Sequence, residues 1–236
     1  MRPNFPQCYK IDSKPSKFCP GCSQTLILKN LGFVIDELKI ASKVVYGCDI
    51  GCMLLSWDFF DLNTVQTHHG RTGPTMVGLK YAAPERIVIA YMGDGGAYAI
   101  GAQHLVASSM RNDPITMIIC NNTVYAMTGG QEAPTTLCNE ITTSTIRGRV
   151  CNGSRPLLGP ELVRSLNKKA YVARGTTLNI SQMKNFIKRA ILHQKKGNFS
   201  FLEILSGCPI NWKTDARETR EFLKEIEKTF PTGEIP

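Results

Sequence analysis

Residues 86–122 read RIVIAYMGDGGAYAIGAQHLVASSMRNDPITMIICNN, and this stretch decides the fold. Two apolar runs, Arg86–Met92 and Ile115–Cys120, have the length and composition of buried strands. Each run ends in a polar turn, and the stretch between them, Ala97–Met110, is predicted to be a helix. The order strand, glycine turn, helix, strand predicts a parallel pair. Both polar turns then lie at the carboxyl ends of strands, where open parallel sheets bind ligands.

The two polar turns contain ligands suited to a hydrated divalent cation. The first is GDGG at residues 93–96, and the second begins at Asn121, 27 residues after Asp94. A carboxylate and an amide oxygen are hard ligands of the kind with which proteins hold Mg²⁺ against phosphates. The glycines allow close approach of the backbone, and the following helix presents free N–H groups to an anion. Either turn alone is compatible with an ordinary tight turn, but the joint spacing favours a diphosphate site.

This pair of turns resembles the signature of thiamine diphosphate (TPP) enzymes, in which a GDG turn is followed at this spacing by NN. In that family the Asp, the second Asn and a backbone carbonyl two residues further on hold the metal. The resemblance implies Mg²⁺ ligands at Asp94, Asn122 and the Val124 carbonyl. Thr128, in the loop that follows, is expected to donate a hydrogen bond to a diphosphate oxygen.

Composition and charge indicate one globular domain spanning residues 1–236. The chain is 42% hydrophobic and 20% charged, which is ordinary for a soluble protein. No signal-peptide pattern or membrane-spanning run is evident, so we expect a cytoplasmic protein without membrane attachment. The net charge of +9 comes from scattered Lys and Arg residues without a nucleic-acid-binding motif. A basic face would instead suit an acidic electron carrier.

Nine cysteines are a high number for a chain with no export signal, and they favour metal or redox chemistry over disulfides. Cys19-Pro-Gly-Cys22 is the clearest metal-binding candidate. Cys52 and Cys208 each follow a predicted strand, at the same edge of the sheet as the TPP motif. Four such thiolates would satisfy a [4Fe–4S] cluster.

The remaining cysteines have weaker signals. Cys48 is an alternative to Cys52, and together with Cys52, Cys19 and Cys22 it would suit a structural zinc site. Cys120 ends an apolar run and is predicted to lie in the core. No role is expected for Cys8, Cys138 and Cys151.

Taken in order, the motifs resemble the beta subunit of 2-oxoacid:ferredoxin oxidoreductases. They are CPGC (19–22), DIGC (49–52), HHGR (68–71), GDGG (93–96), NNTVYAMTGGQEAPTT (121–136) and SGCP (206–209). The resemblance covers about residues 18–212. It implies an α/β TPP-binding fold with TPP, Mg²⁺ and one [4Fe–4S] cluster, held by Cys19, Cys22, Cys52 and Cys208. It also places His69 and Arg71 near the cofactor. The cofactor-binding residues expected are therefore Cys52, His69, Arg71, Gly93, Asp94, Gly95, Gly96, Asn122, Val124 and Thr128.

The implied reaction is oxidative decarboxylation of a 2-oxoacid, with coenzyme A as acyl acceptor and ferredoxin as electron acceptor. The segments Met127–Gln131 and Pro134–Thr136 resemble the 2-oxoglutarate and branched-chain members more than the pyruvate members. Some relatives have a lysine where this chain has Gly129, so how a distal substrate carboxylate is bound stays open.

TPP also needs a glutamate beside its pyrimidine ring, and TPP enzymes take it from a separate domain for which this chain has no room. We therefore expect partner subunits of alpha or gamma type, one of which supplies that residue. Two alternatives are a non-oxidative TPP decarboxylase or synthase subunit, which needs no thiolates, and a zinc-binding nucleic-acid protein, which has no use for the GDGG and NN turns.

The rest of the chain predicts alternating helices and strands, and hence a mostly parallel sheet with helices on both faces. Helices are expected over 23–38, 72–81, 161–169, 180–193 and 215–230, and strands near 44 and over 170–173 and 199–205. Residues Asn139–Pro160 are predicted to form a long surface loop or a subunit contact.

Overall fold

A seven-stranded sheet lies at the centre of the computed structural model, which describes residues 5–10 and 16–236. Its strand order is β2-β1-β3-β4-β8-β7-β9. All neighbouring strands are parallel except β9, which is antiparallel to β7. The strands are β1 (Val44–Cys48), β2 (Asn63–Gln66), β3 (Ile87–Gly93), β4 (Thr116–Asn121), β7 (Tyr171–Thr176), β8 (Ser200–Leu205) and β9 (Gly233–Glu234). The predicted mostly parallel sheet is confirmed.

The central strands β3 and β4 are mostly apolar and almost entirely buried because both of their faces are covered. In β3, Ile89 belongs to one core cluster and its neighbour Ala90 belongs to the other. Successive side chains of a strand point to opposite faces, so an uninterrupted apolar run marks a strand that is buried on both sides.

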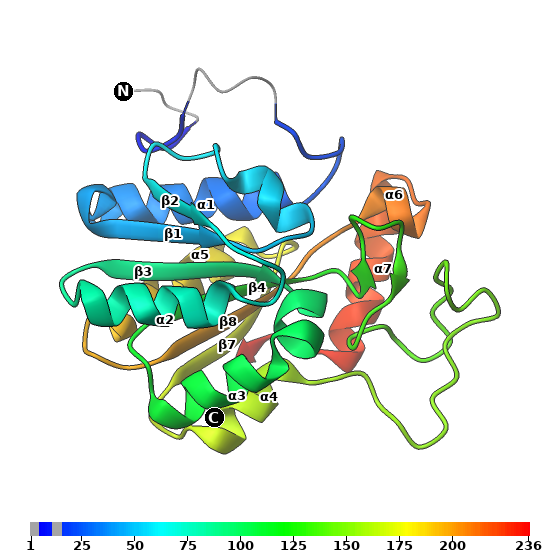
Figure 1. Cartoon of the computed structure of the whole chain (residues 1–236). Helices are drawn as coiled ribbons and strands as arrows, with labels where there is room; N and C mark the ends of the chain where they lie inside the picture. Colours follow the sequence, from blue (N-terminus) through cyan, green and yellow to red (C-terminus); the bar gives the residue numbers. More distant parts are fainter. Residues whose placement is uncertain (1–4, 11–15) are drawn as a thin grey trace.

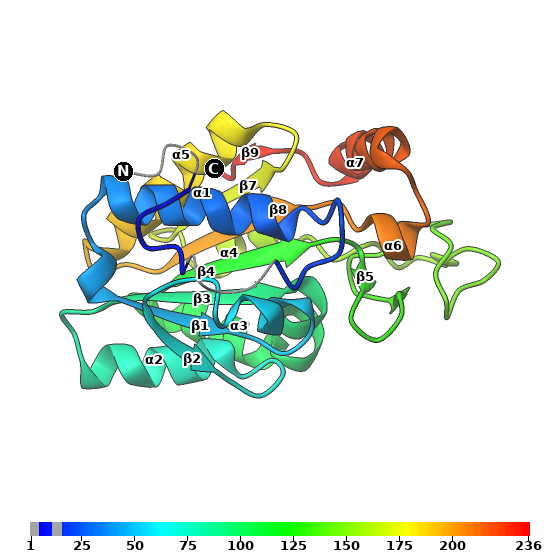
Figure 2. The same ribbon diagram turned by 90° about the horizontal axis from the view of Figure 1, so that it is seen from above.

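Helices cover both faces of the sheet, with α1 and α5 on one face and α2, α3 and α4 on the other (Figures 1 and 2). Two further helices, α6 and α7, lie beyond the carboxyl end of β8. The helices are α1 (Gln24–Glu37), α2 (Thr72–Ala82), α3 (Ala102–Arg111), α4 (Gly159–Leu166), α5 (Ile180–Gln194), α6 (Pro209–Trp212) and α7 (Ala216–Thr229). Within residues 5–10 and 16–236, no helix combines the length and apolar character that a bilayer crossing requires.

Two of the predicted helices show why the sequence forms them. On α5, apolar residues at helical spacing, among them Met183, Ile187 and Ile191, are buried against the sheet, whereas Ile180 at the start of the helix is exposed. α7 begins with a capping box, in which the Asp215 carboxylate accepts a hydrogen bond from the Glu218 N–H at 2.8 Å and the Glu218 carboxylate accepts one from the Asp215 N–H at 2.9 Å.

The prediction of one continuous helix over Ala97–Met110 was wrong in detail. Residues Gly96–Ile100 form a π-helical turn, labelled η3, and α3 begins only at Ala102. The interruption falls at Gly101, where a Cβ would lie 2.6 Å from the carbonyl oxygen of Gly70. This close approach of two backbones depends on a loop distant in sequence, so helical propensity did not reveal it. π-Helical turns are frequent at functional sites.

Short elements connect the larger ones. They are η1 (Ala41–Lys43), η2 (Cys52–Ser56), which is a 3₁₀ helix, and the hairpin of β5 (Val124–Tyr125) and β6 (Gln131–Glu132). From β6 to α4 the chain has no regular structure, which agrees with the predicted loop over 139–160 except that α4 starts at Gly159. This loop extends away from the sheet beside α7 (Figure 1).

Candidate functional site

A pocket lies at the carboxyl edge of the sheet, where the loops after β1, β3 and β4 meet. It is lined by residues 50–53 from the first loop, 93–96 from the second and 122 and 124–128 from the third, together with His69. The chain passes from β1 to β2 on one side of β1, whereas β3 and β4 lie on its other side. Ligands of doubly wound sheets bind at such a switch point. The sequence predicted this edge, and the pocket brings together nine of the ten expected cofactor-binding residues.

Asp94 is a buried carboxylate at the floor of the pocket. It is 3% exposed, and its Oδ2 accepts a hydrogen bond from the Thr135 hydroxyl. Burial raises the pKa of Asp94 to about 7, although the hydrogen bonds from Thr135 and the Gly95 backbone act in the opposite direction. In the described part of the chain, no Lys or Arg forms an ion pair with it. A buried carboxylate with polar donors and no cationic partner suits a bound divalent cation.

The Asn121–Val124 turn lies beside Asp94 because β3 and β4 pair in parallel, with Gly93 opposite Cys120. Asn121 shapes the turn, since its Oδ1 accepts a hydrogen bond from the Thr123 N–H at 3.0 Å, and Thr123 adopts a φ of 64°. Asn122 is the asparagine that lines the pocket, and its Oδ1 accepts only a long hydrogen bond from the Val124 N–H at 3.3 Å. The two asparagines therefore have different environments, and the second is available to a ligand.

The two later glycines of GDGG are required by close contacts. A Cβ on Gly95 would lie 2.1 Å from the Tyr125 ring, and a Cβ on Gly96 would lie 2.0 Å from Asp49 Oδ2. Both distances are far shorter than any real contact, so a side chain at either position would have to displace the Tyr125 ring or the Asp49 carboxylate. Sequence reasoning attributed these glycines to the approach of an anion. The structure shows that they also admit neighbouring side chains.

Asp49 is a feature of the site that sequence reasoning missed. Its fully buried carboxylate accepts hydrogen bonds from the Gly70 N–H at 2.8 Å, the Thr72 hydroxyl at 3.2 Å and His69 Nδ1 at 3.3 Å. Burial raises the pKa of Asp49 above its usual range, and the neighbouring His69 offsets part of this rise. The arrangement fixes the His69 ring at the pocket wall. Asp49 was visible in the sequence as the first residue of the DIGC motif, directly after β1, but nothing there linked it to His69.

Arg71 and Thr128 both form hydrogen bonds within the chain, and only Thr128 lines the pocket. Arg71 does not line the pocket. Its Nη1 donates to the Ile100 carbonyl at 3.1 Å, and it lines a neighbouring polar depression with His68. Thr128 does line the pocket, but its hydroxyl is bonded to Gln131 Oε1 at 2.6 Å.

A second cavity, of about 260 Å³, lies against the first and is lined by Cys19, Cys22, Cys52 and Cys208. The two cavities share Cys52, Asn122, Ala126 and Met127 as lining residues. Burial raises the pKa of Cys22 to about 11 and of Cys52 to about 12, and it also raises that of Cys208. Among the residues described, no three His, Cys, Asp or Glu side chains lie close enough to hold a single ion. The four thiols instead surround a space.

Cys48, the predicted alternative to Cys52, lies elsewhere. It is fully buried in the core, its thiol donates to the Val65 carbonyl, and it lines neither cavity. Cys120 is also buried in the core, as predicted, with its sulfur 2.8 Å from the Ser206 hydroxyl. Cys8 is buried and donates its thiol to the Gly32 carbonyl.

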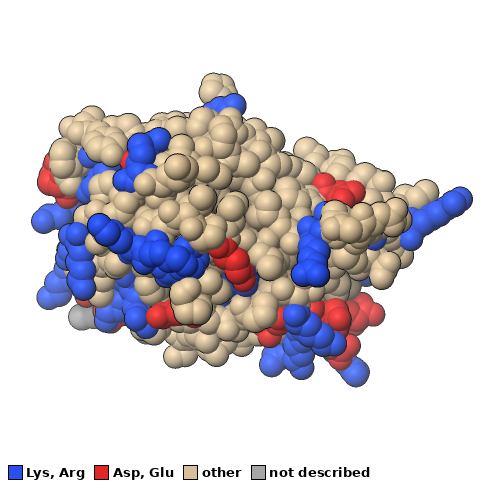
Figure 3. Space-filling model, turned by 90° about the horizontal axis from the view of Figure 1, so that it is seen from below, with Lys and Arg blue, Asp and Glu red and all other residues tan. Residues whose placement is uncertain are grey.

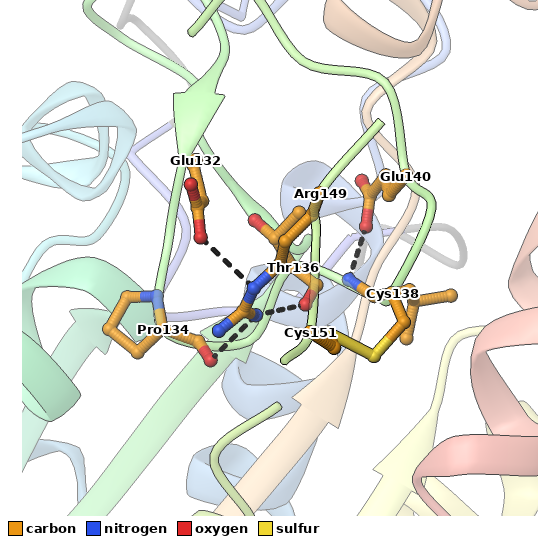
Figure 4. Close-up of a disulfide and its surroundings, with 8 residues drawn as sticks. Glu132, Pro134, Thr136, Cys138, Glu140, Arg149 and Cys151 are labelled. Carbon is orange, nitrogen blue, oxygen red and sulfur yellow. Dashed lines mark hydrogen bonds and ion pairs between the residues drawn. A yellow bond between two sulfur atoms is a disulfide. The ribbon is translucent and has the colours of Figure 1, made fainter. Parts of the chain in front are cut away.

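The prediction of no role for Cys138 and Cys151 was wrong, because these two residues form a disulfide (Figure 4). Their Cα atoms are 5.6 Å apart, within the usual range for a disulfide, since the twelve residues between them turn back on themselves. This turn lies in the irregular loop after β6, where the sequence has no periodic pattern from which the pairing could be read.

Comparisons with known proteins agree with this geometry. The family model "Thiamine pyrophosphate enzyme, C-terminal TPP binding domain" matches residues 49–204. The chain is 36% identical over 220 residues to ketoisovalerate oxidoreductase subunit VorA of Methanothermobacter thermautotrophicus, covering 91% of this chain and 46% of that protein. It is 32% identical over 225 residues to 2-oxoglutarate synthase subunit KorB of Archaeoglobus fulgidus, covering 95% and 82%.

A solved structure is similar as well. The 2-oxoglutarate:ferredoxin oxidoreductase from Magnetococcus marinus, with 2-oxoglutarate, coenzyme A and succinyl-CoA bound, superposes with a TM-score of 0.81 at 27% identity. The match covers 95% of this chain and 74% of that one. The chain spans about half the length of the ketoisovalerate oxidoreductase subunits that it matches. From its fold, its pocket and these similarities, the chain belongs to the TPP-binding subunits of the 2-oxoacid:ferredoxin oxidoreductase family.

Proposed function

We propose that this chain is the TPP-binding subunit of an enzyme that oxidatively decarboxylates a 2-oxoacid, transfers the acyl group to coenzyme A and reduces ferredoxin. The observation that supports this most strongly is the contact between two cavities, one suited to a diphosphate and a cation and the other lined by four thiols. Bound TPP supplies the nucleophile and electron sink that allow CO₂ to leave a 2-oxoacid, and a bound iron–sulfur cluster accepts electrons one at a time.

In this proposal, Asp94, Asn122 Oδ1 and the Val124 carbonyl hold Mg²⁺. The buried charge of Asp94 needs a cation, and the Asn122 oxygen has room for one beside its long hydrogen bond. Gly93, Gly95 and Gly96 bring the backbone close to the diphosphate, and Thr128 reaches it once its hydroxyl turns from Gln131. The residues present therefore fit the cofactor that the family binds.

Cys19, Cys22, Cys52 and Cys208 are the proposed [4Fe–4S] ligands. Thiols that surround a cavity suit a multi-iron cluster, because the irons and sulfides of the cluster fill the space between its ligands. Bound iron also favours the thiolate form, which offsets the cost of burying these groups. Cys52 lines both cavities, so it would provide the shortest route between cofactor and cluster.

The proposed substrate is 2-oxoglutarate or a branched-chain 2-oxoacid, since relatives with both names match this chain. His69, fixed by Asp49, faces the pocket and is available to a substrate or cofactor oxygen. Arg71 lines the neighbouring depression, two residues after His69 in the chain, and would contact a longer substrate or a partner subunit there. Gly129 supplies no cation for a distal carboxylate.

Further subunits of alpha or gamma type are part of the proposal, because the pyrimidine-activating glutamate is expected from one of them. Ferredoxin is the proposed electron acceptor in a cytoplasmic enzyme that binds neither nucleic acid nor membrane. Figure 3 shows Lys and Arg gathered in several groups on one face, with Asp and Glu between them. A net charge of +9 favours the approach of an acidic electron carrier.

Iron analysis of anaerobically purified protein tests this proposal. About four irons per chain with broad absorption at ~400 nm are expected for wild type, and Cys208→Ser should lower both. Cys48→Ala is the matched control, because Cys48 lies outside the cavity, and it should retain the iron. Iron that survives Cys208→Ser but not Cys48→Ala would overturn the ligand assignment. A colourless protein that decarboxylates a 2-oxoacid without an electron acceptor would favour the non-oxidative alternative.

A further inference from the structure

Thr135 forms a hydrogen bond to the pocket residue Asp94 from a segment that the proposed function leaves without a role. Its side chain is fully buried, and its hydroxyl donates to Asp94 Oδ2. A hydroxyl has one proton to donate, so this bond satisfies one carboxylate oxygen and fixes the orientation of the group. Oδ1 is then directed to other partners. Thr135 is thus positioned to orient a ligand without being one.

The backbone of Thr135 is itself held on both sides by Arg149. Nη1 of Arg149 donates to the Thr136 carbonyl and, at 3.4 Å, to the Pro134 carbonyl. Nε of the same guanidinium pairs with Glu132 Oε1 at 3.0 Å. Figure 4 shows this guanidinium lying between the three groups. The planar arrangement of its donors suits such multiple contacts.

Arg149 is held by the disulfide-closed segment, which we define as residues 138–151. The Asn139 N–H donates to the Arg149 carbonyl at 2.8 Å, and the Arg149 N–H donates to the Glu140 carbonyl at 2.9 Å. The Cys138–Cys151 disulfide joins the two ends of this segment. Glu140 joins the segment to the metal-binding turn, since its carboxylate accepts the Thr123 hydroxyl at 2.6 Å and the Leu137 N–H at 2.7 Å.

We propose that Thr135 is a positioning residue for the cation-binding carboxylate Asp94, and that the disulfide-closed segment holds Thr135 in place through Arg149. This inference rests on the proposed function, because it assumes that Asp94 binds the divalent cation. Groups that orient metal ligands typically change metal affinity by roughly 10- to 100-fold when removed. Such a role would also account for the several hydrogen bonds that the irregular loop after β6 forms with residues around the pocket.

The test measures Mn²⁺ binding, as a spectroscopic substitute for Mg²⁺, by electron paramagnetic resonance of the full chain in the presence of TPP. Thr135→Val keeps the shape and removes the donor, so its dissociation constant for Mn²⁺ should rise by roughly 10- to 100-fold. Thr135→Ser restores the hydroxyl and should bind within about threefold of wild type. Thr116→Val is the matched control, because Thr116 is fully buried and its hydroxyl has no partner among the described residues.

The double variant Cys138→Ser/Cys151→Ser tests the second part of the proposal, and its Mn²⁺ dissociation constant should rise severalfold. Unchanged Mn²⁺ affinity in Thr135→Val, with thermal unfolding like wild type, overturns the positioning role. Unchanged affinity in the double variant overturns the role of the disulfide. If Thr135→Val does not fold, Thr135→Ala gives the same comparison, since it places no methyl group against the carboxylate. Absence of Mn²⁺ binding in wild type would contradict the proposed function itself.

Discussion

The substitution Gly96→Ala is expected to destabilise the fold, because Gly96 packs directly against the buried Asp49 carboxylate. A Cβ at this position would lie 2.0 Å from Asp49 Oδ2 and 3.2 Å from His69 Cε1. The carboxylate cannot move aside freely, since it accepts hydrogen bonds from the Gly70 N–H and the Thr72 hydroxyl. Relief of the clash must therefore break at least one of these bonds or shift the η3 backbone.

The size of the effect follows from two contributions. Overpacking a buried site costs about 1–3 kcal/mol, and loss of a hydrogen bond to a buried charged group costs about 1.5–3 kcal/mol. The free energy of unfolding of Gly96→Ala should therefore be about 2.5–6 kcal/mol lower than that of wild type. Because His69 lines the pocket and moves with Asp49, TPP affinity should fall as well.

Urea unfolding in the absence of cofactor measures the first effect, and TPP titration measures the second. Gly78→Ala is the control, because Gly78 is an exposed residue inside α2 and an added Cβ meets nothing within 4 Å. Helix propensity should make this variant about 0.5–1 kcal/mol more stable than wild type. The reasoning would be refuted by a Gly96→Ala protein as stable as the Gly78→Ala protein.

Two further predictions concern buried charge. Arg174→Met leaves Glu203 buried without its cation, so the free energy of unfolding measured in urea should fall by about 3–5 kcal/mol. As the control, Arg217→Met breaks the exposed Arg217–Glu221 pair and should lower it by less than about 0.5 kcal/mol. Equal losses in the two variants would contradict this prediction. Burial raises the pKa of Glu140 to about 7, so the stability linked to its protonated form is complete below pH about 4.5 and is lost as the pH rises through about 7. Glu140→Gln should make the pH profile of stability flatter there, and a parallel profile would exclude this origin.

The sequence predicted the parts of the fold that depend on local pattern. The apolar runs of β3 and β4 and the turns after them were recognisable because a strand covered on both faces needs no polar alternation. The helical spacing of apolar residues on α5 was an equally local signal. The neighbouring positions of Asp94 and Asn122 followed from parallel pairing alone.

Features created by contacts between distant segments were not predictable. The break at Gly101 depends on Gly70, and the role of Asp49 depends on a loop twenty residues further on. The Cys138–Cys151 pairing depends on the path of an irregular loop, where counting cysteines favoured metal ligation. Thr135 was visible only as part of a family motif, since its hydrogen bond to Asp94 crosses 41 residues of sequence.

The most direct test of the central claim is an anomalous-scattering map at the iron edge, from a crystal grown anaerobically with Mg²⁺ and TPP. The account predicts one four-iron cluster bound by Cys19, Cys22, Cys52 and Cys208, and a cation on Asp94, Asn122 and the Val124 carbonyl in the adjoining pocket. Iron bound at other cysteines, or a cation that does not touch Asp94, would contradict it.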